Sequence, residues 1–150
     1  MSIRTLALLI SFASCASSLH AQPDDVRTVI GDFLAAFRNR DFAVFMPYFS
    51  EDATVFFPPS AAAPAGRIRG RTSIEQAFKT VFDRYPARST GARVPIAPQE
   101  LLVEQFDSFA VVTFELGVGT ARQRRTFVLR RIEGAWRIVH LHGSASGTPQ

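Results

Sequence analysis

Cysteine is nearly absent from this chain of 150 residues, in which Cys15 is the single copy. It falls within a segment that we expect to be removed, so the mature protein would contain no cysteine. A disulfide, a thiol nucleophile and a thiolate-bound metal are therefore excluded as the basis of its function. The sequence also lacks a glycine-rich phosphate loop, a nucleophile elbow and the ligand spacing of a zinc site.

The sequence also lacks a hydrophobic run long enough to span a membrane. A membrane-spanning helix needs about 20 apolar residues. The N-terminal run Leu6–Ala13 is far shorter, follows Arg4 and leads into small residues that end at Ala21. A charged start, a short apolar stretch and a small residue at the cut are typical of a secretory signal peptide. The sequence therefore predicts a signal peptide over residues 1–21.

Cleavage after Ala21 would leave one domain over residues 22–147 and a tail over 148–150. We expect a bacterial protein that is exported to the periplasm or secreted, with no membrane attachment once the signal peptide is gone. The residues leading to Cys15 loosely resemble a lipoprotein cleavage site. Lipid anchoring at Cys15 is therefore the alternative.

The excess of positive charge is small. Loss of the signal peptide leaves 16 basic residues against 13 acidic ones, a net charge of +3, which does not indicate binding to nucleic acid. Five arginines gather in one predicted hairpin. Alternation sends Arg125 and Arg131 to one face and Arg122, Arg124 and Arg130 to the other. We expect most of this basic surface to be solvated or to lie in a dimer interface.

Hydrophobic periodicity divides the mature chain into helices and strands. Spacing of three and four residues predicts a helix from an Asp24 cap to Asn39, a short one over Phe42–Met46, and a third from the capping box Thr72–Glu75 to Pro86. Ser50–Asp52 is interpreted as a turn. The predicted strands are Thr54–Phe57, Arg67–Gly70, Glu100–Phe106, Phe109–Val118, Arg124–Ile132 and Ala135–Ser144.

Helices first and a meander of strands afterwards predict an α+β fold. Three N-terminal helices would pack on one face of a curved, mostly antiparallel sheet. Glu133–Gly134 is expected to close a tight hairpin between the last two strands, because Gly accepts a positive φ. On a strongly curved sheet, the 14 phenylalanines could line a cavity, although filling a core is their usual role.

Alternation along the last two strands predicts which side chains share a face. One face of the last strand would carry Trp136, Ile138, His140 and His142, and the other Arg137, Val139 and Leu141. On the preceding strand, Arg125, Phe127 and Leu129 share a face that we expect to be the concave one. Two imidazoles would then lie side by side at the end of the sheet.

Three blocks of sequence resemble a known family. They are Phe33–Phe37 with Arg40–Phe42, then Phe49–Val55 leading to Gly70–Ile74, and last Gly134–His142 with Ser144. This order is similar to the SnoaL-like proteins of the nuclear-transport-factor-2-like superfamily, and the last block most resembles the association domain of calcium/calmodulin-dependent kinase II. The resemblance implies the cone-shaped cystatin-like fold. It does not assign an activity, because this fold hosts many unrelated sites.

The catalytic residues of ketosteroid isomerases, which belong to the same superfamily, have no counterparts here. The resemblance aligns their base with Phe57, their tyrosine donor with Phe33 and their oxyanion acid with the vicinity of Val128. Isomerase chemistry is therefore not expected. The kinase association domain places arginines inside its cone. Arg125 matches one of them, whereas two others fall near Glu115 and Gly143.

We expect a cone pocket for a small, largely apolar ligand, with a carboxylate group as one option. Its lining is predicted to include Arg125, Phe33, Phe57, Phe127 and Trp136, with Arg125 as the polar anchor. No cofactor and no nucleic acid partner are expected. A homodimer through the open face of the sheet is expected.

Two alternatives remain open. His140 or His142, with Tyr48 as a donor, could serve as the acid and base of a small-molecule cyclase, dehydratase or hydrolase. The domain could instead be a ligand-free dimerisation or assembly module. Glu115 could complete a metal site with the two histidines, but nothing else supports it and no metal is expected.

Overall fold

A computed structural model describes residues 25–58, 66–84, 96–118 and 121–146 of the chain. The predicted signal peptide, Cys15 and the C-terminal tail lie outside these residues. In chain order the elements are α1 (Val26–Arg38), α2 (Phe42–Phe45), the 3-10 turn η1 (Met46–Tyr48), β1 (Phe49–Phe56), β2 (Arg67–Arg69), α3 (Arg71–Arg84), β3 (Pro98–Gln105), β4 (Phe109–Val118), β5 (Ala121–Ile132) and β6 (Ala135–Ser146). No described helix is long and apolar enough to cross a membrane.

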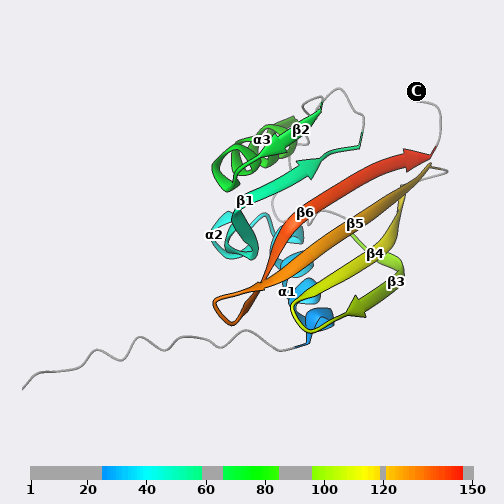
Figure 1. The fold of residues 1–150 in the computed structure, drawn as a ribbon. Helices are drawn as coiled ribbons and strands as arrows, with labels where there is room; N and C mark the ends of the chain where they lie inside the picture. The colour runs from blue at the N-terminus through cyan, green and yellow to red at the C-terminus, as the bar shows by residue number, and fades with distance from the viewer. Residues whose placement is uncertain (1–24, 59–65, 85–95, 119–120, 147–150) are drawn as a thin grey trace, which may run out of the picture.

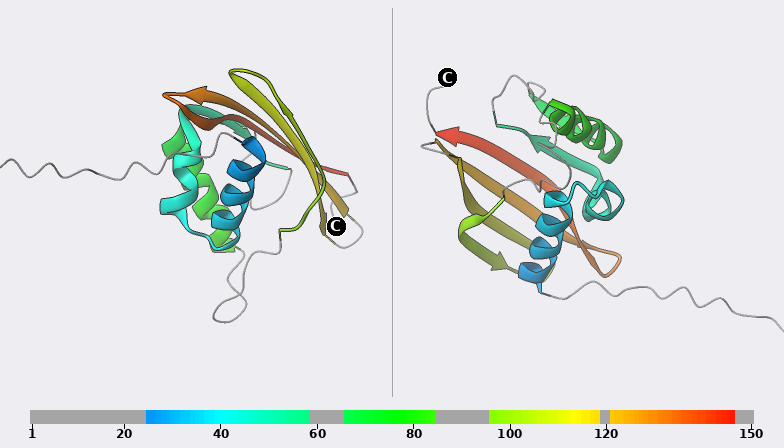
Figure 2. Two further views of the ribbon diagram at one scale, coloured as in Figure 1. Left: turned by 90° about the horizontal axis from the view of Figure 1, so that it is seen from below. Right: turned by 180° about the vertical axis from the view of Figure 1, so that it is seen from behind.

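The six strands form one curved sheet in the order β2-β1-β6-β5-β4-β3 (Figure 1). β1 and β6 run parallel, and the other neighbouring strands run antiparallel. The prediction of a mostly antiparallel sheet is therefore confirmed. The described helices lie on one side of this sheet (Figure 2). We call the side that they cover the inner face and the opposite side the outer face.

Helix α1 begins one residue later than the sequence predicted. Asp25, and not Asp24, is the N-cap, and its carboxylate accepts hydrogen bonds from the backbone N–H groups of Arg27 and Thr28 at 3.1 and 3.3 Å. These bonds lower the pKa of Asp25, the one from Arg27 most, because they stabilise the charged carboxylate. Val26, at the first helical position, is fully buried.

The end of α1 is joined to α2 by a Schellman motif. The Asp41 N–H donates to the Ala36 carbonyl at 3.0 Å, and the Arg40 N–H donates to the Phe37 carbonyl at 2.9 Å. Arg40 has a φ of 57°, which is the left-handed conformation that this motif requires. Asp41 then caps α2 by accepting from the Val44 N–H at 3.2 Å.

One predicted turn is wrong, and one predicted hairpin is confirmed. Ser50–Asp52, predicted as a turn, belongs to β1, which begins at Phe49 and has an irregular register with β6 between Phe49 and Thr54. The irregularity interrupts the alternation, which is why the sequence pattern resembled a turn. Glu133 and Gly134 have φ values of 52° and 80°, so the hairpin predicted at this dipeptide is confirmed as a type I′ turn.

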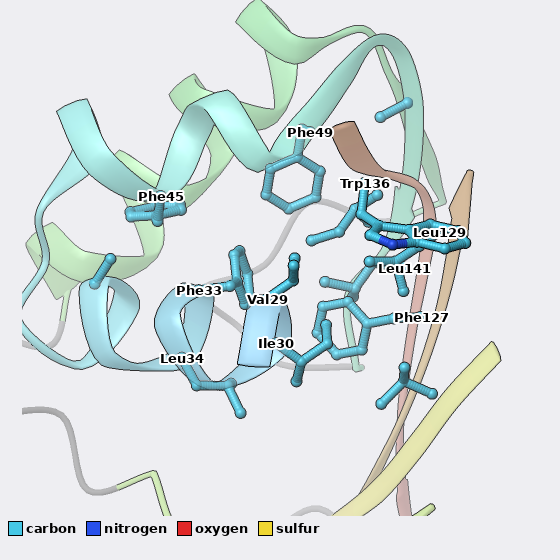
Figure 3. Close-up of a cluster of buried hydrophobic side chains, with 14 of the residues drawn as sticks. Val29, Ile30, Phe33, Leu34, Phe45, Phe49, Phe127, Leu129, Trp136 and Leu141 are labelled. Carbon is cyan, nitrogen blue, oxygen red and sulfur yellow. The ribbon is translucent and has the colours of Figure 1, made fainter. Parts of the chain in front are cut away.

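The core lies between the helices and the inner face. Figure 3 shows Phe33 of α1 directed toward Phe127 of β5, with Phe49 and Trp136 nearby. The ring of Phe33 packs edge-on against Phe127 at 5.5 Å and against Phe49 at 5.7 Å between centroids. Edge-to-face contacts of this kind stabilise aromatic clusters beyond the burial of their area.

A β-bulge in β6 changes the predicted pattern of faces. His140 pairs with Val128, whereas Ile138 pairs with Leu129, so Val139 is an extra residue in β6. One extra residue exchanges the two faces for every later position of a strand. The predicted grouping of His140 and His142 with Trp136 and Ile138 is therefore wrong.

After the bulge, the residues on the inner face are Leu141 and Gly143, and the histidines turn outward. Leu141 is buried and pairs with Val55 and Phe127, which are also buried. His142 is exposed and pairs with Phe56. The two faces of β6 are thus assigned by its neighbours in the sheet.

Candidate functional site

Arg125 lies on the inner face with Phe127 and Leu129, as alternation predicted. It pairs with Phe114 on β4 and with Gly143 on β6. Its Nη1 donates to the backbone carbonyl of Arg124 at 2.9 Å, and its Nη2 donates to Oε1 of Gln123. The guanidinium is thus held by neighbours on its own strand.

The charge of Arg125 has no acidic partner in the part of the chain that the structure describes. No carboxylate there lies within ion-pair distance of its guanidinium. The residue is half-buried, and burial lowers the pKa of Arg125 because a charged group loses hydration there. The site therefore presents a partly desolvated cation, which an anion would stabilise.

The surroundings of Arg125 are apolar. Phe114 stacks on Phe127 with 5.5 Å between ring centroids, and Leu116 packs beside the core. Gly143 provides the space for this arrangement. A Cβ at position 143 would lie 2.7 Å from Pro58 Cδ and 3.3 Å from Arg125 Nη1. Gln123 was not predicted as part of this site, because neither the spacing nor the composition of the chain marks it. Gly143 was identified only as a position near a pocket arginine of the kinase association domain, and its role in leaving space was not predicted.

The other predicted pocket residues are mostly part of the core. Phe33 and Phe127 are each 2% exposed and Trp136 is 1% exposed. Phe57 is half-buried and packs edge-on against Phe78 of α3 with 5.0 Å between centroids. Of the aromatic residues in the predicted lining, Phe127 lies nearest to Arg125 in the sheet, two residues away on the same face.

Tyr48 does not join the histidines. Its ring packs edge-on against Phe33, with 6.0 Å between centroids, at the helix-covered side. Burial raises the pKa of Tyr48, and the nearby carboxylate of Asp32 adds to this effect. His140 and His142 lie on the outer face, so these three residues do not form a shared acid–base site inside the cone.

The histidines belong to a small cluster on the outer face of β1 and β6. The Nδ1 atom of His140 lies 2.8 Å from Thr54 Oγ1. The ring of Phe56 packs against both imidazoles, with its centroid 6.1 Å from that of His140 and 5.7 Å from that of His142. Burial lowers the pKa of His140, and His142 and Arg67 lower it further because positive charges oppose protonation.

Glu115 does not complete a metal site with these histidines. Its carboxylate forms ion pairs with Arg122 at 2.6 Å and with Arg124 at 3.3 Å. These hydrogen bonds lower the pKa of Glu115, the one from Arg122 most. Among the described residues, no group of three or more His, Cys, Asp and Glu side chains could hold a metal ion.

The basic hairpin divides as alternation predicted. Arg122 and Arg124 lie on the outer face with Glu115, and Arg131 lies on the inner side with its guanidinium carbon 5.1 Å from the centroid of the Trp136 ring. Large exposed apolar side chains occur at the β3–β4 end of the sheet. They are Leu102 at 53%, Phe106 at 50% and Phe109 at 44% exposure, and the rings of Phe106 and Phe109 stack on each other.

Comparison with known proteins gives a family and a fold. The family profile of the SnoaL-like domain matches residues 26–147. No curated protein matches the chain.

Solved structures of similar fold come from several bacteria. An NTF2-like protein of unknown function from Pseudomonas putida KT2440 is 22% identical, with a TM-score of 0.66 over 82% of this chain and 85% of that one. A candidate ketosteroid isomerase from Parabacteroides distasonis is 18% identical, with a TM-score of 0.61 over 85% and 92%. A candidate kinase II association domain from Thiobacillus denitrificans is 18% identical, with a TM-score of 0.63 over 81% and 94%. At these identities the likeness shows the fold alone.

Proposed function

The chain belongs to the SnoaL-like domain family, and we propose on this premise that it binds a small, largely apolar molecule that carries a carboxylate group. The binding group is the guanidinium of Arg125. The observation that supports this is a half-buried cation on the inner face with no carboxylate partner among the described residues.

A bound carboxylate would pair with the charge of Arg125 and accept its remaining hydrogen bonds. Arg125 uses one Nη1 and one Nη2 hydrogen on its own strand, which leaves further N–H groups for a ligand. A guanidinium binds a carboxylate through two parallel hydrogen bonds, and such bonds are strong where water is partly excluded. Phe114 and Leu116 would contact the apolar part of the molecule.

The test is calorimetric titration of the protein with small acids such as benzoate and hexanoate. Arg125→Met should abolish binding while the fold persists, because it removes the charge and keeps most of the side-chain volume. Arg124→Met is the matched control, since Arg124 is the adjacent residue on the outer face and pairs with Glu115. Equal affinity in the wild type and Arg125→Met would rule out the anchor, as would equal loss in both variants.

An assembly module without a ligand is the second candidate. It is supported by the filled interior, where Phe33, Phe127 and Trp136 are buried against other core side chains. Complete absence of acid binding together with a stable oligomer would favour this function over the first.

We propose that the protein is a homodimer that associates through the outer face of its sheet. The exposed side chains of Leu102, Phe106 and Phe109 support this, because a second copy would remove them from water. Light scattering should show the mass of a dimer for the wild type and of a monomer for Leu102→Glu with Phe109→Glu. Val44→Glu is the control, since Val44 is similarly exposed but lies on α2.

Export remains a proposal that rests on the N-terminal sequence. Mass spectrometry of the exported protein should show a chain that begins at Gln22, because Ala21 is the small residue at the predicted cut. A lipidated chain that begins at Cys15 would contradict this and indicate a membrane anchor.

A further inference from the structure

We propose that His140 and His142 form a two-imidazole binding site for a divalent transition-metal ion, Cu²⁺ above all, on the outer face of the sheet. This site is separate from the proposed ligand site at Arg125, which lies on the inner face. It follows from the bulge at Val139, which turns both histidines outward, and from the contact between His140 and Thr54.

The backbone brings the two imidazoles together. Residues two apart on a strand lie on one face with their Cα atoms about 7 Å apart, and two histidine side chains can converge over that distance. Phe56 on β1 packs against both rings, with centroids 6.1 and 5.7 Å away, and so limits their positions from the same side. β1 and β6 are paired here, which fixes Thr54 opposite His140 and Phe56 opposite His142.

Thr54 is placed to stabilise the form of His140 whose Nε2 can bind a metal. Its Oγ1 lies 2.8 Å from Nδ1 of His140 and 3.5 Å from the Val139 carbonyl. In the tautomer with a proton on Nδ1, Oγ1 accepts the hydrogen bond from Nδ1–H and directs its own hydrogen to the carbonyl, so both contacts are satisfied. Nε2 of this tautomer keeps its lone pair for a metal. Metal-binding histidines ordinarily have such a partner on their other nitrogen.

The chemistry of the donors indicates the class of metal. Imidazole nitrogen suits Cu²⁺, Ni²⁺ and Zn²⁺, and at a given site Cu²⁺ binds most tightly of the three. Hard cations such as Mg²⁺ and Ca²⁺ prefer oxygen ligands and are not expected here. Because Glu115 is paired with Arg122 and Arg124, water would occupy the remaining coordination positions.

The location is compatible with the dimer proposed above. Leu102, Phe106 and Phe109 lie on or beside β3 and β4, whereas the histidines lie on β6 beside β1. In the sheet order, β3 is at one edge and β1 is next to the opposite edge. A partner that covers the β3–β4 end need not cover the two imidazoles.

The experiment is titration of the full chain with Cu²⁺, followed by calorimetry and by electron paramagnetic resonance. The wild type should bind one ion with nitrogen ligands. Either His140→Gln or His142→Gln should lower the association constant about tenfold or more, because each removes one of two ligands. Arg125→Met should leave Cu²⁺ binding unchanged, which separates this result from the test of the acid-binding site.

The contribution of Thr54 has its own matched pair of variants. Thr54→Val should weaken Cu²⁺ binding about tenfold, since an outer-shell partner of a ligand typically contributes this much. Thr126→Val is the control, because Thr126 pairs with His142 on the same face and its hydroxyl makes no hydrogen bond to an imidazole there. Equal effects of the two substitutions would contradict the role of Thr54.

The metal site itself is overturned by either of two results. One is the absence of Cu²⁺ binding by the wild type. The other is a double variant, His140→Gln with His142→Gln, that keeps the stoichiometry and affinity of the wild type, since binding would then come from other groups of the chain.

Discussion

At the scale of single residues, Gly143 shows most directly how the inner face is built. It has no need of a positive φ, yet a Cβ there would lie 2.7 Å from Pro58 Cδ and 3.2 Å from the Pro58 nitrogen. Proline is rigid, so this contact cannot be relieved by rotating a side chain. The absence of a side chain at position 143 therefore lets the end of β1 approach β6 beside Arg125.

Gly143→Ala should destabilise the protein by about 1–3 kcal/mol, the usual cost of overpacking. The free energy of unfolding in urea measures this. Gly117→Ala on β4 is the control, since the nearest atom to its added Cβ is the flexible Gln99 side chain at 3.8 Å. A Gly143→Ala protein as stable as this control would show that Pro58 is free to move.

At the scale of elements, the start of α1 depends on one carboxylate. Asp25→Ala should cost about 1 kcal/mol of stability at neutral pH, since it leaves backbone N–H groups of the first turn without their acceptor. The pKa of Asp25 is lower in the folded protein than in the unfolded chain. Its contribution is therefore present above the unfolded pKa of about 4 and is lost as the pH falls through the lower folded value.

Unfolding curves at several pH values measure this effect. Asp25→Asn is the matched control, because asparagine keeps a capping oxygen but cannot titrate. Its stability should lack the part of the acid dependence that Asp25 contributes. A wild type and an Asp25→Asn protein with the same acid dependence would contradict the assigned cap.

The β5–β6 hairpin allows a prediction of the opposite sign. Glu133 has a φ of 52°, which is unfavourable for most residues but is tolerated by asparagine. Glu133→Asn should stabilise the protein by about 0.5 kcal/mol, and Glu133→Val should destabilise it because a β-branched side chain is strained at positive φ. Thermal unfolding of the two variants measures the difference, and the same melting temperature for both would be inconsistent with a type I′ turn.

At the scale of the whole molecule, apolar side chains occupy the positions that the family resemblance aligns with the polar catalytic residues of ketosteroid isomerases. Phe33 and Phe57, which the family resemblance aligns with the tyrosine donor and the catalytic base of the isomerases, are rings without polar atoms. Phe33 is buried, and Phe57 packs on Phe78. Val128, which the resemblance aligns with the oxyanion acid of the isomerases, lies on the outer face opposite His140. Its neighbours on the inner face, Phe127 and Leu129, are also apolar.

We therefore expect no isomerisation of a β,γ-unsaturated steroid ketone. Absorbance of the conjugated product measures this directly. Turnover that persists in a His140→Gln and His142→Gln double variant would show that the alignment of Phe33 and Phe57 with the isomerase positions is wrong.

Much of this protein follows from local sequence. Helical spacing predicted α1 and α3, Asp41 and the Glu133–Gly134 turn were identified from residue type, and the family resemblance predicted the fold. Alternation placed Arg125 correctly because β5 keeps a regular register with β4 from end to end. In each case the deciding interaction lies within one element or between neighbours in the chain.

The tertiary structure alone decided where the bulge in β6 exchanges the two faces of this strand. Val139 is an extra residue only relative to Val128 and Leu129 on β5, and a bulge is a property of a pair of strands. The same holds for the contact of Thr54 with His140 and for the space that Gly143 leaves to Pro58, since these residues are far apart in the chain. Local sequence determines the period of a strand, and the packing of its neighbours determines the face that each residue occupies.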